Sequence, residues 1–262
     1  MPLLTFIVLS VVTFAVDSFN STESIPRSPY QVNILDAKYF VGGGALIKSD
    51  VVITAASLIE KRDWTLFVRA GSNLCKGGYQ RRVIENILHP AYNLKLRKEN
   101  NLALLFLYKP FELRSSIQAL NLPETPVLAA STLIINKVNA TGYRNEVWSE
   151  KCYIHTWKTE IIPKVICERM YPKLSRNMLC AGDLDNPSNR HPYAVGNPLV
   201  ANGTLVGIAA GCSSCNHNLF PLLYMNITHY REWIVKSIDS WTIYKSYKLP
   251  HTKPTIPAEI EQ

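Results

Sequence analysis

The sequence has little charge and, beyond its first residues, no long apolar run. Only 18% of its 262 residues are charged and 47% are hydrophobic, a balance typical of a globular chain rather than a disordered one. After residue 16 no segment is long and apolar enough to cross a bilayer. Internal repeats and the alternating strand and helix patterns of βαβ units are also missing. These absences argue against a disordered chain, a multispan membrane protein, a repeat protein and a doubly wound α/β fold.

Acidic residues are scarce relative to basic ones. There are 20 Asp and Glu against 28 Lys and Arg, which gives a formal net charge of +8 and a pI near 9.1. Such a balance favours acidic partners such as glycosaminoglycan, an acidic protein surface or anionic lipid.

The N-terminus carries the marks of export. Residues 3–16, LLTFIVLSVVTFAV, suit the apolar core of a signal peptide and are short for a membrane span. No positive side chain precedes them, so an uncleaved anchor is the alternative. Cleavage after Ala15 or Ser18 satisfies the small-residue requirement, and we expect residues 1–18 to be a signal peptide. A secreted, extracellular chain is not expected to bind nucleic acid.

Two further features fit an exported protein. Four Asn-X-Ser/Thr sequons predict glycosylation at Asn20, Asn139, Asn202 and Asn226. Six cysteines suggest up to three disulfides, and the count alone does not give their pairing.

Many short apolar runs separated by turn residues predict an all-β barrel or sandwich. Examples are YQVNIL, DVVITAA, NLALLFLY and TLVGIAA. One helix is expected at residues 228–245, where an apolar stripe at helical spacing would dock on the β core and Thr228 can cap the start. The stripe consists of Tyr230, Trp233, Ile234, Ile238 and Trp241. We therefore expect one domain at 19–245 and a flexible tail at 246–262, which holds three prolines.

In order and separation, these segments resemble the trypsin/chymotrypsin family of serine proteases across nearly the whole mature chain. Residues 42–57, GGGALIKSDVVITAAS, are similar to the family block CGGSLI…WVVTAAHC. The other similar blocks are HPAYN (89–93), NNLALLFL (100–107), NMLCAGD (177–183), VGNPLVANGTLVGIAAGC (195–212) and YREWI (230–234). The resemblance implies two perpendicular six-stranded β-barrels with a C-terminal α-helix and a cleft between the barrels.

The same resemblance implies that the catalytic groups are missing. The family needs a hydroxyl nucleophile, an imidazole base and a carboxylate that orients the base. The corresponding positions are Val195, Ser57 and Asn101. Valine has no nucleophilic atom, serine is no base near neutral pH, and an amide has no charge to stabilise an imidazolium. We expect an inactive homologue; a displaced triad would have to use His89 or His191.

Other parts of the family's machinery differ too. Tyr193 stands at the position of the family's oxyanion-hole glycine, and Ala194 at that of the aspartate that pairs with a freed N-terminus. Asn189 stands at the base of the specificity pocket. No IVGG-like sequence follows Arg27, after which a new N-terminus would begin Ser-Pro.

The resemblance also bears on the cysteines. The family's disulfide beside the catalytic histidine would join the positions of Gly42 and Leu58, and a second would join Thr132 and Ala201. Both pairs are replaced together, which leaves no orphan thiol. Cys167 and Cys180 match a bridge that the family has.

The other four cysteines have no full family counterpart. We expect a rewired Cys75–Cys152 bridge and a local Cys212–Cys215 bridge. A redox motif, or a zinc site that includes His217, is the alternative for the second pair.

A basic region corresponds to the 70s loop and its neighbours, which form a common exosite in this family. Its residues are Lys76, Arg81, Arg82, Lys95, Arg97 and Lys98. They are either a solvated surface or an exosite for an acidic protein or glycosaminoglycan.

We therefore expect a secreted pseudoprotease that acts by binding an extracellular protein: an active protease, a substrate or a receptor. It would serve as a regulator, cofactor or decoy in an extracellular or reproductive-fluid protease pathway. The alternatives are a weakly active serine-type endopeptidase and a structural or carrier glycoprotein. We expect no cofactor, metal ion or membrane span.

Overall fold

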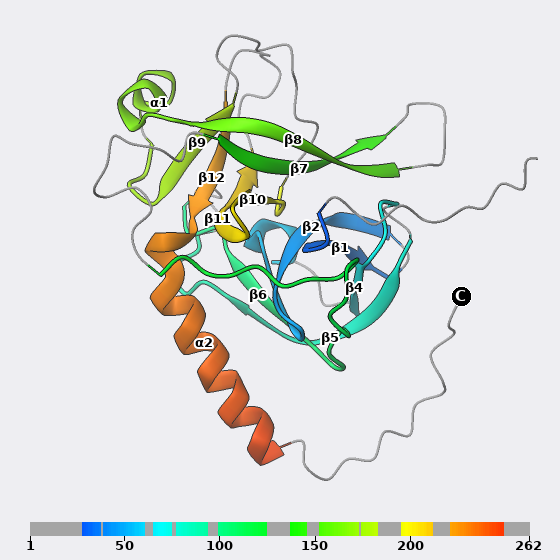
Figure 1. The fold of residues 1–262 in the computed structure, drawn as a ribbon. Helices are drawn as coiled ribbons and strands as arrows, with labels where there is room; N and C mark the ends of the chain where they lie inside the picture. The colour runs from blue at the N-terminus through cyan, green and yellow to red at the C-terminus, as the bar shows by residue number, and fades with distance from the viewer. Residues whose placement is uncertain are drawn as a thin grey trace, which may run out of the picture.

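The fold was obtained as a computed structural model (Figure 1). It describes residues 28–37, 39–60, 65–74, 77–93, 99–124, 137–145, 152–172, 174–182, 195–211 and 221–248. For residues 137–139, 141–145, 152, 211 and 248 it describes the backbone alone.

Six antiparallel strands close the first barrel in the order β1-β2-β3-β6-β5-β4. They are β1 (Gln31–Asp36), β2 (Tyr39–Lys48), β3 (Val51–Thr54), β4 (Leu66–Ala70), β5 (Tyr79–Leu88) and β6 (Ala103–Leu107). The β-branched run of β3 and the apolar run of β6 are buried throughout, because their alternate side chains join two different hydrophobic cores, one on each face. A single 3₁₀ turn, η1 (Ala56–Leu58), follows β3.

The second barrel is closed in the order β10-β11-β12-β9-β8-β7. Its strands are β7 (Lys137–Asn145), β8 (Cys152–Ile162), β9 (Met178–Gly182), β10 (Pro198–Ala201), β11 (Thr204–Gly211) and β12 (Leu222–Asn226). The far half of the β7–β8 hairpin extends over the first barrel (Figure 1), where Tyr153 of β8 pairs with Leu74. The expected all-β fold with two six-stranded barrels is confirmed.

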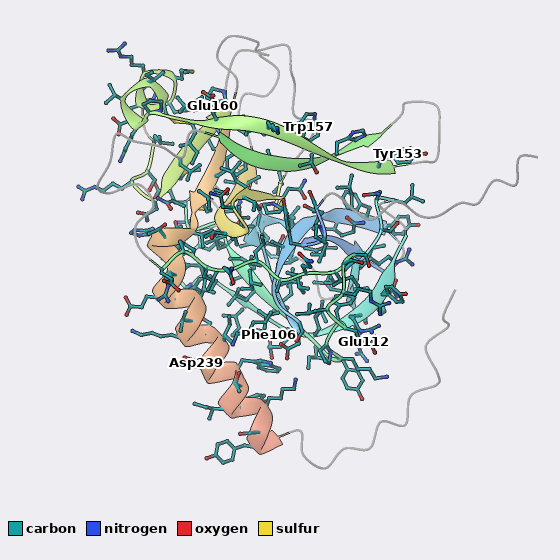
Figure 2. All side chains as sticks on the ribbon, in the orientation of Figure 1. Phe106, Glu112, Tyr153, Trp157, Glu160 and Asp239 are labelled. Carbon is teal, nitrogen blue, oxygen red and sulfur yellow. A yellow bond between two sulfur atoms is a disulfide. The ribbon has the colours of Figure 1, made fainter. Side chains whose placement is uncertain are left out.

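A long helix, α2 (Ile227–Lys248), begins at the end of β12 and runs down the side of the first barrel (Figure 1). Its buried residues recur at helical spacing: Ile227, Tyr230, Ile234, Ile238 and Trp241. The Trp241 ring lies 5.0 Å from that of Phe106 in β6, which is labelled beside the helix in Figure 2. The predicted docking face is confirmed, with Trp233 only partly buried.

Both ends of α2 differ from the prediction. Asn226, not Thr228, caps the helix, because the Asn226 side-chain oxygen accepts the Thr228 N–H at 3.2 Å. At the other end the helix continues to Lys248, past the boundary expected at 245. Residues 246–248 contain no helix breaker, and the first proline of the tail is Pro250.

One hydrophobic core joins the two barrels and α2. The same cluster contains Ile53 and Phe106 of the first barrel, Leu205 and Met225 of the second, and Ile234 of the helix. The barrels are therefore packed into one unit at the seam where the site lies. Neither helix among the described residues is long and apolar enough to span a membrane.

The second helix, α1 (Lys164–Met170), is short and is tied to the second barrel by a disulfide. Cys167 of α1 is bonded to Cys180 of β9, with their Cα atoms 6.1 Å apart. This bridge confirms the predicted pairing.

Candidate functional site

The three residues that the family resemblance predicts at the catalytic positions lie near the seam between the barrels. Ser57 lies in η1, Asn101 directly precedes β6, and Val195 lies in the turn before β10. Ser57 and Val195 are half-buried, whereas Asn101 is fully buried.

The Asn101 amide is used on both of its ends. Its oxygen accepts the Ser57 backbone N–H at 2.8 Å. Its nitrogen donates to the Ser57 hydroxyl at 3.0 Å and to the Ala210 carbonyl of β11 at 3.3 Å. A carboxylate could accept the first of these bonds but could not donate to the Ala210 carbonyl. The pocket is therefore matched to an amide, and no charged group lies in this network.

The turn at Val195 is fixed by its backbone. The Val195 carbonyl accepts the Gly43 N–H at 3.4 Å, and the Gly196 N–H donates to Ala209 at 2.8 Å. Gly196 has φ +83°, and a Cβ there would lie 2.6 Å from the Thr54 hydroxyl oxygen, so the turn requires glycine. Val195 offers only an aliphatic side chain at this place.

Gly42 and Leu58, which stand at the positions of a family disulfide, are side by side. A Cβ placed on Gly42 would lie 2.5 and 2.9 Å from the two methyl carbons of Leu58. The leucine side chain therefore fills the space that a larger residue at 42 would need. The two replacements are complementary in volume.

A second polar link joins the barrels through residues that the sequence analysis did not single out. The Gln31 side chain of β1 donates to the Asn197 side-chain oxygen at 2.8 Å, and Asn197 is fully buried. The Asn197 side-chain nitrogen has no hydrogen-bond partner among the described residues. Gly43 makes room for Asn197, because a Cβ on Gly43 would overlap its side-chain oxygen. The sequence signal for Asn197 was that VGNPLV has asparagine where the family motif DSGGPLV has its second glycine.

His89, the described one of the two histidines considered for a displaced triad, packs against α2. Its ring centroid lies 4.8 Å from that of Trp233 and 5.2 Å from that of Tyr230 in α2. Its Nδ1 accepts the Ala91 N–H at 3.2 Å. Burial lowers the pKa of His89, and the charge of His229 lowers it further.

Two of the six predicted exosite residues are described, both on β5. The Arg81 guanidinium donates to the Pro110 carbonyl at 3.2 Å and lies 5.2 Å from the Phe111 ring centroid. Arg82 is exposed and is paired across the strands with Phe67. Arg81 therefore packs as a structural residue, while Arg82 faces solvent.

Several predicted site residues lie outside the described residues. They are Asn20, Cys75, Lys76, Lys95, Arg97, Lys98, Thr132, Asn189, His191, Tyr193, Ala194, Cys212, Cys215 and His217. For Asn139 and Cys152 only the backbone is described.

Known proteins similar to this chain point to one family. The trypsin family model matches residues 19–234. Trypsin of Xenopus laevis is 29% identical over 220 residues, which cover 81% of this chain and 86% of that protein. Among solved structures, neuropsin, a serine protease expressed in the limbic system of mouse brain, has a TM-score of 0.69 at 26% identity and covers 83% of this chain and 98% of its own.

A second structure resembles the chain in fold alone. The scabies mite inactivated protease paralogue S-D1 has a TM-score of 0.71 at 22% identity, covering 82% of this chain and 94% of its own. Because the family model spans well over half of the sequence and the two closed barrels agree with it, the chain belongs to the trypsin family.

Proposed function

We propose that this chain is a secreted, catalytically inactive trypsin-family protein that acts by binding another extracellular protein. The observation that carries the proposal is the Asn101 amide, whose two ends are both hydrogen-bonded at the place of the family's orienting carboxylate. A histidine oriented by a carboxylate is what lets the family remove the proton of its nucleophile. Here the network is complete without any group that titrates.

The nucleophile's position supports the same conclusion. Val195 has no atom that could attack a carbonyl carbon, and the neighbouring turn is packed against Leu58 and Thr54. Leu58 itself fills the space beside Gly42. Reactivation would therefore require changes in packing as well as in the three side chains.

Residues 28–31, which directly follow the candidate cleavage position at Arg27, are packed against the rest of the chain. Ser28 is only 4% exposed, and its hydroxyl lies 2.7 Å from that of Thr156 in β8. The Ser28 carbonyl accepts the Gln31 N–H at 2.9 Å, and the Pro29 carbonyl accepts the Gln118 N–H at 3.0 Å. These contacts support a protein that works as a single chain, without a freed N-terminus that moves into the core.

A partner-binding role is what a rigid scaffold without catalytic groups can still perform. Loops on such a scaffold are the usual binding elements. The apolar segment 3–16 and the sequons support secretion. The partner is an active protease, a substrate that the chain shields or a receptor, and the chain acts on it as a regulator, cofactor or decoy.

The test of inactivity is labelling with a fluorophosphonate probe. The purified full-length chain should remain unlabelled under conditions that label an active trypsin completely. A labelled residue in this chain would overturn the proposal and support a weakly active endopeptidase.

The binding role is tested separately by capture. Immobilised chain is incubated with the extracellular fluid of the tissue that secretes it, and captured proteins are identified by mass spectrometry. A protease, protease substrate or receptor that competes with soluble chain supports the role, whereas no competed protein contradicts it.

The basic surface adds a glycosaminoglycan as a second ligand. Retention on immobilised heparin should weaken as salt rises, because the contacts are electrostatic. The Arg82→Ala variant should elute earlier than the Arg81→Ala variant, since Arg82 is the exposed one of the pair. Retention that does not depend on salt would count against this ligand.

A further inference from the structure

The hairpin between β10 and β11 carries a sequon at its tip. Ala201 pairs with Thr204, which leaves Asn202 and Gly203 as a two-residue loop. Their φ angles are +47° and +75°, the signs that a type I′ turn requires. Asparagine and glycine tolerate these angles best, so the turn by itself explains the two residue types but not the threonine that follows.

The loop leaves Asn202 open to a large substituent. Asn202 and Gly203 are exposed and Thr204 is half-exposed. A Cβ on Gly203 would have no atom within 4 Å, so the space beside this residue is open among the residues that the structure describes. The side chain of Asn202 forms no hydrogen bond within the described part of the chain. A group attached to it would break no contact.

The backbone beneath the loop is held independently of the Asn202 side chain. The Gly203 carbonyl accepts the Asn121 N–H at 3.1 Å, and the Asn121 carbonyl accepts the Leu205 N–H at 2.9 Å. The hairpin is thus anchored to the connection between the barrels. A substituent on Asn202 would project from a fixed base.

The Asn226 side chain, unlike that of Asn202, is half-buried and hydrogen-bonded. Asn226 lies between Met225 and Ile227, both of which are fully buried. Its side-chain oxygen caps α2 through the Thr228 N–H, and its backbone N–H donates to the Asn177 carbonyl at 2.9 Å. The structure uses this side chain to start the helix.

We propose that Asn202 carries an N-linked glycan and that Asn226 does not. The donor is an oligosaccharide carried on a lipid pyrophosphate. The Asn202 side-chain nitrogen loses a proton and forms a bond to the anomeric carbon, while the bond from that carbon to the pyrophosphate breaks and the lipid pyrophosphate leaves. The Thr204 hydroxyl completes the sequon that the transferring enzyme reads.

This inference rests on export, which is also part of the proposed function. The test uses the full chain, expressed with its own N-terminus in a eukaryotic cell line and recovered from the medium. It is treated with peptide N-glycosidase in heavy-oxygen water and then digested and mapped. That enzyme converts a glycosylated asparagine into a heavy-labelled aspartate, whereas an Asn-Gly pair that lost ammonia earlier gives an unlabelled one.

The expected result is heavy label at residue 202 and none at residue 226. Unlabelled Asn202 in chain recovered from the medium would overturn the Asn202 site, and label at residue 226 would overturn the distinction between the two sequons. If no chain reaches the medium or the secretory membranes, the export assumption itself fails. An unlabelled but exported chain leaves the binding role untouched, so the two failures are distinguishable.

Matched variants separate the glycan from the turn. Thr204→Ala should increase electrophoretic mobility by one glycan, whereas Thr204→Ser, which keeps the sequon, should not. Asn226→Gln should migrate as the unsubstituted chain does. The peptide map of the unsubstituted chain shows whether Asn202 and Asn226 are glycosylated even if one of these variants fails to fold.

Discussion

At the scale of single residues, the seam is held by buried polar side chains that hydrogen-bond to one another. Asn101 accepts from Ser57 and donates to both Ser57 and Ala210. Gln31 donates to Asn197 across the same seam. Such buried polar groups are expensive to leave unpaired, so each partner constrains the other.

The first prediction concerns the Asn101 amide. Asn101→Asp should lower the free energy of unfolding by about 1–3 kcal/mol, because the Ala210 carbonyl would lose its donor and face another acceptor. Urea unfolding at pH 7 measures this change. Asn121→Asp, the same chemical change on an exposed side chain, serves as the control and should have little effect. Equal losses in both variants would contradict the role assigned to Asn101.

A second residue-scale prediction concerns Gly42 and Leu58. Gly42→Ala should destabilise the chain by about 1–3 kcal/mol, because the new methyl group overlaps the Leu58 side chain. In a Leu58→Ala background the same substitution should cost much less. A double-mutant cycle by urea unfolding measures the coupling, and additive effects would refute the packing account.

At the scale of elements, α2 is seated on the first barrel through an aromatic contact with the His89 turn. His89 packs against Tyr230 and Trp233, and the Tyr230 hydroxyl donates to the Asn100 side-chain oxygen at 3.1 Å. Burial raises the pKa of Tyr230 to about 12, so this hydroxyl keeps its proton at neutral pH. The histidine is the titrating member of the contact.

Stability should therefore fall when His89 is protonated. Its pKa is lowered in the folded chain, so below about pH 6.5 the unfolded chain binds more protons than the folded one. The free energy of unfolding should decrease from pH 7 to pH 5 and stop decreasing below the folded pKa. His89→Asn keeps a side-chain acceptor and should reduce this dependence.

The control for His89 is His155→Asn. His155 lies on β8 beside Trp157, away from α2. The difference between the urea midpoints at pH 7 and pH 5 should shrink in the His89 variant and stay as large as in the unsubstituted chain in the His155 variant. If both variants retain the full pH dependence, the loss arises from other groups, with His229 the first to test.

The pairing of Leu74 with Tyr153 bears on two cysteines whose bridge stays a prediction. These residues form an antiparallel bridge, and Asn73 accepts the Ile154 N–H at 2.8 Å. In the sequence, Cys75 directly follows Leu74 and Cys152 directly precedes Tyr153. Peptide mapping without reduction should recover one peptide pair that contains both. Finding either thiol free would remove the bridge.

At the scale of the whole molecule, the barrels form one body whose seam is fixed from both sides. The Gly43–Val195 and Gln31–Asn197 hydrogen bonds cross it, and the core shared with α2 lies behind them. The seam is therefore held by hydrogen bonds and packing.

Restoring the three catalytic side chains should therefore not restore activity. The triple variant Ser57→His, Asn101→Asp and Val195→Ser still has Tyr193 and Ala194 in place of the oxyanion glycine and the N-terminal partner. It should hydrolyse a short peptide ester no faster than the parent chain and remain unlabelled by fluorophosphonate. Near-ultraviolet circular dichroism or unfolding followed by tryptophan fluorescence must first show that the variant is folded. Fluorophosphonate labelling of a folded triple variant would contradict this prediction, because the three side chains alone would then account for the missing activity.

The fold was largely predictable from the sequence, whereas the loss of catalytic chemistry stays a prediction. Strand segments such as 51–54 and 103–107 are short, apolar and bounded by turns, so their type follows from local pattern. The vacancy at Val195 needs no geometry, since no arrangement gives valine a nucleophilic atom. The cap of α2 was misassigned because Asn226 and Thr228 are both good capping residues and only the backbone geometry chooses between them.

Which chemical groups are present, and in which order the strands come, can therefore be predicted from the sequence. How the side chains at the seam fit together depends on the folded arrangement of the two barrels. Asn101 meets Ser57 at a separation of 44 residues and Ala210 at 109, and Gln31 meets Asn197 at 166. Contacts between residues so far apart follow from the closure and packing of the two barrels, which no local pattern of residues contains.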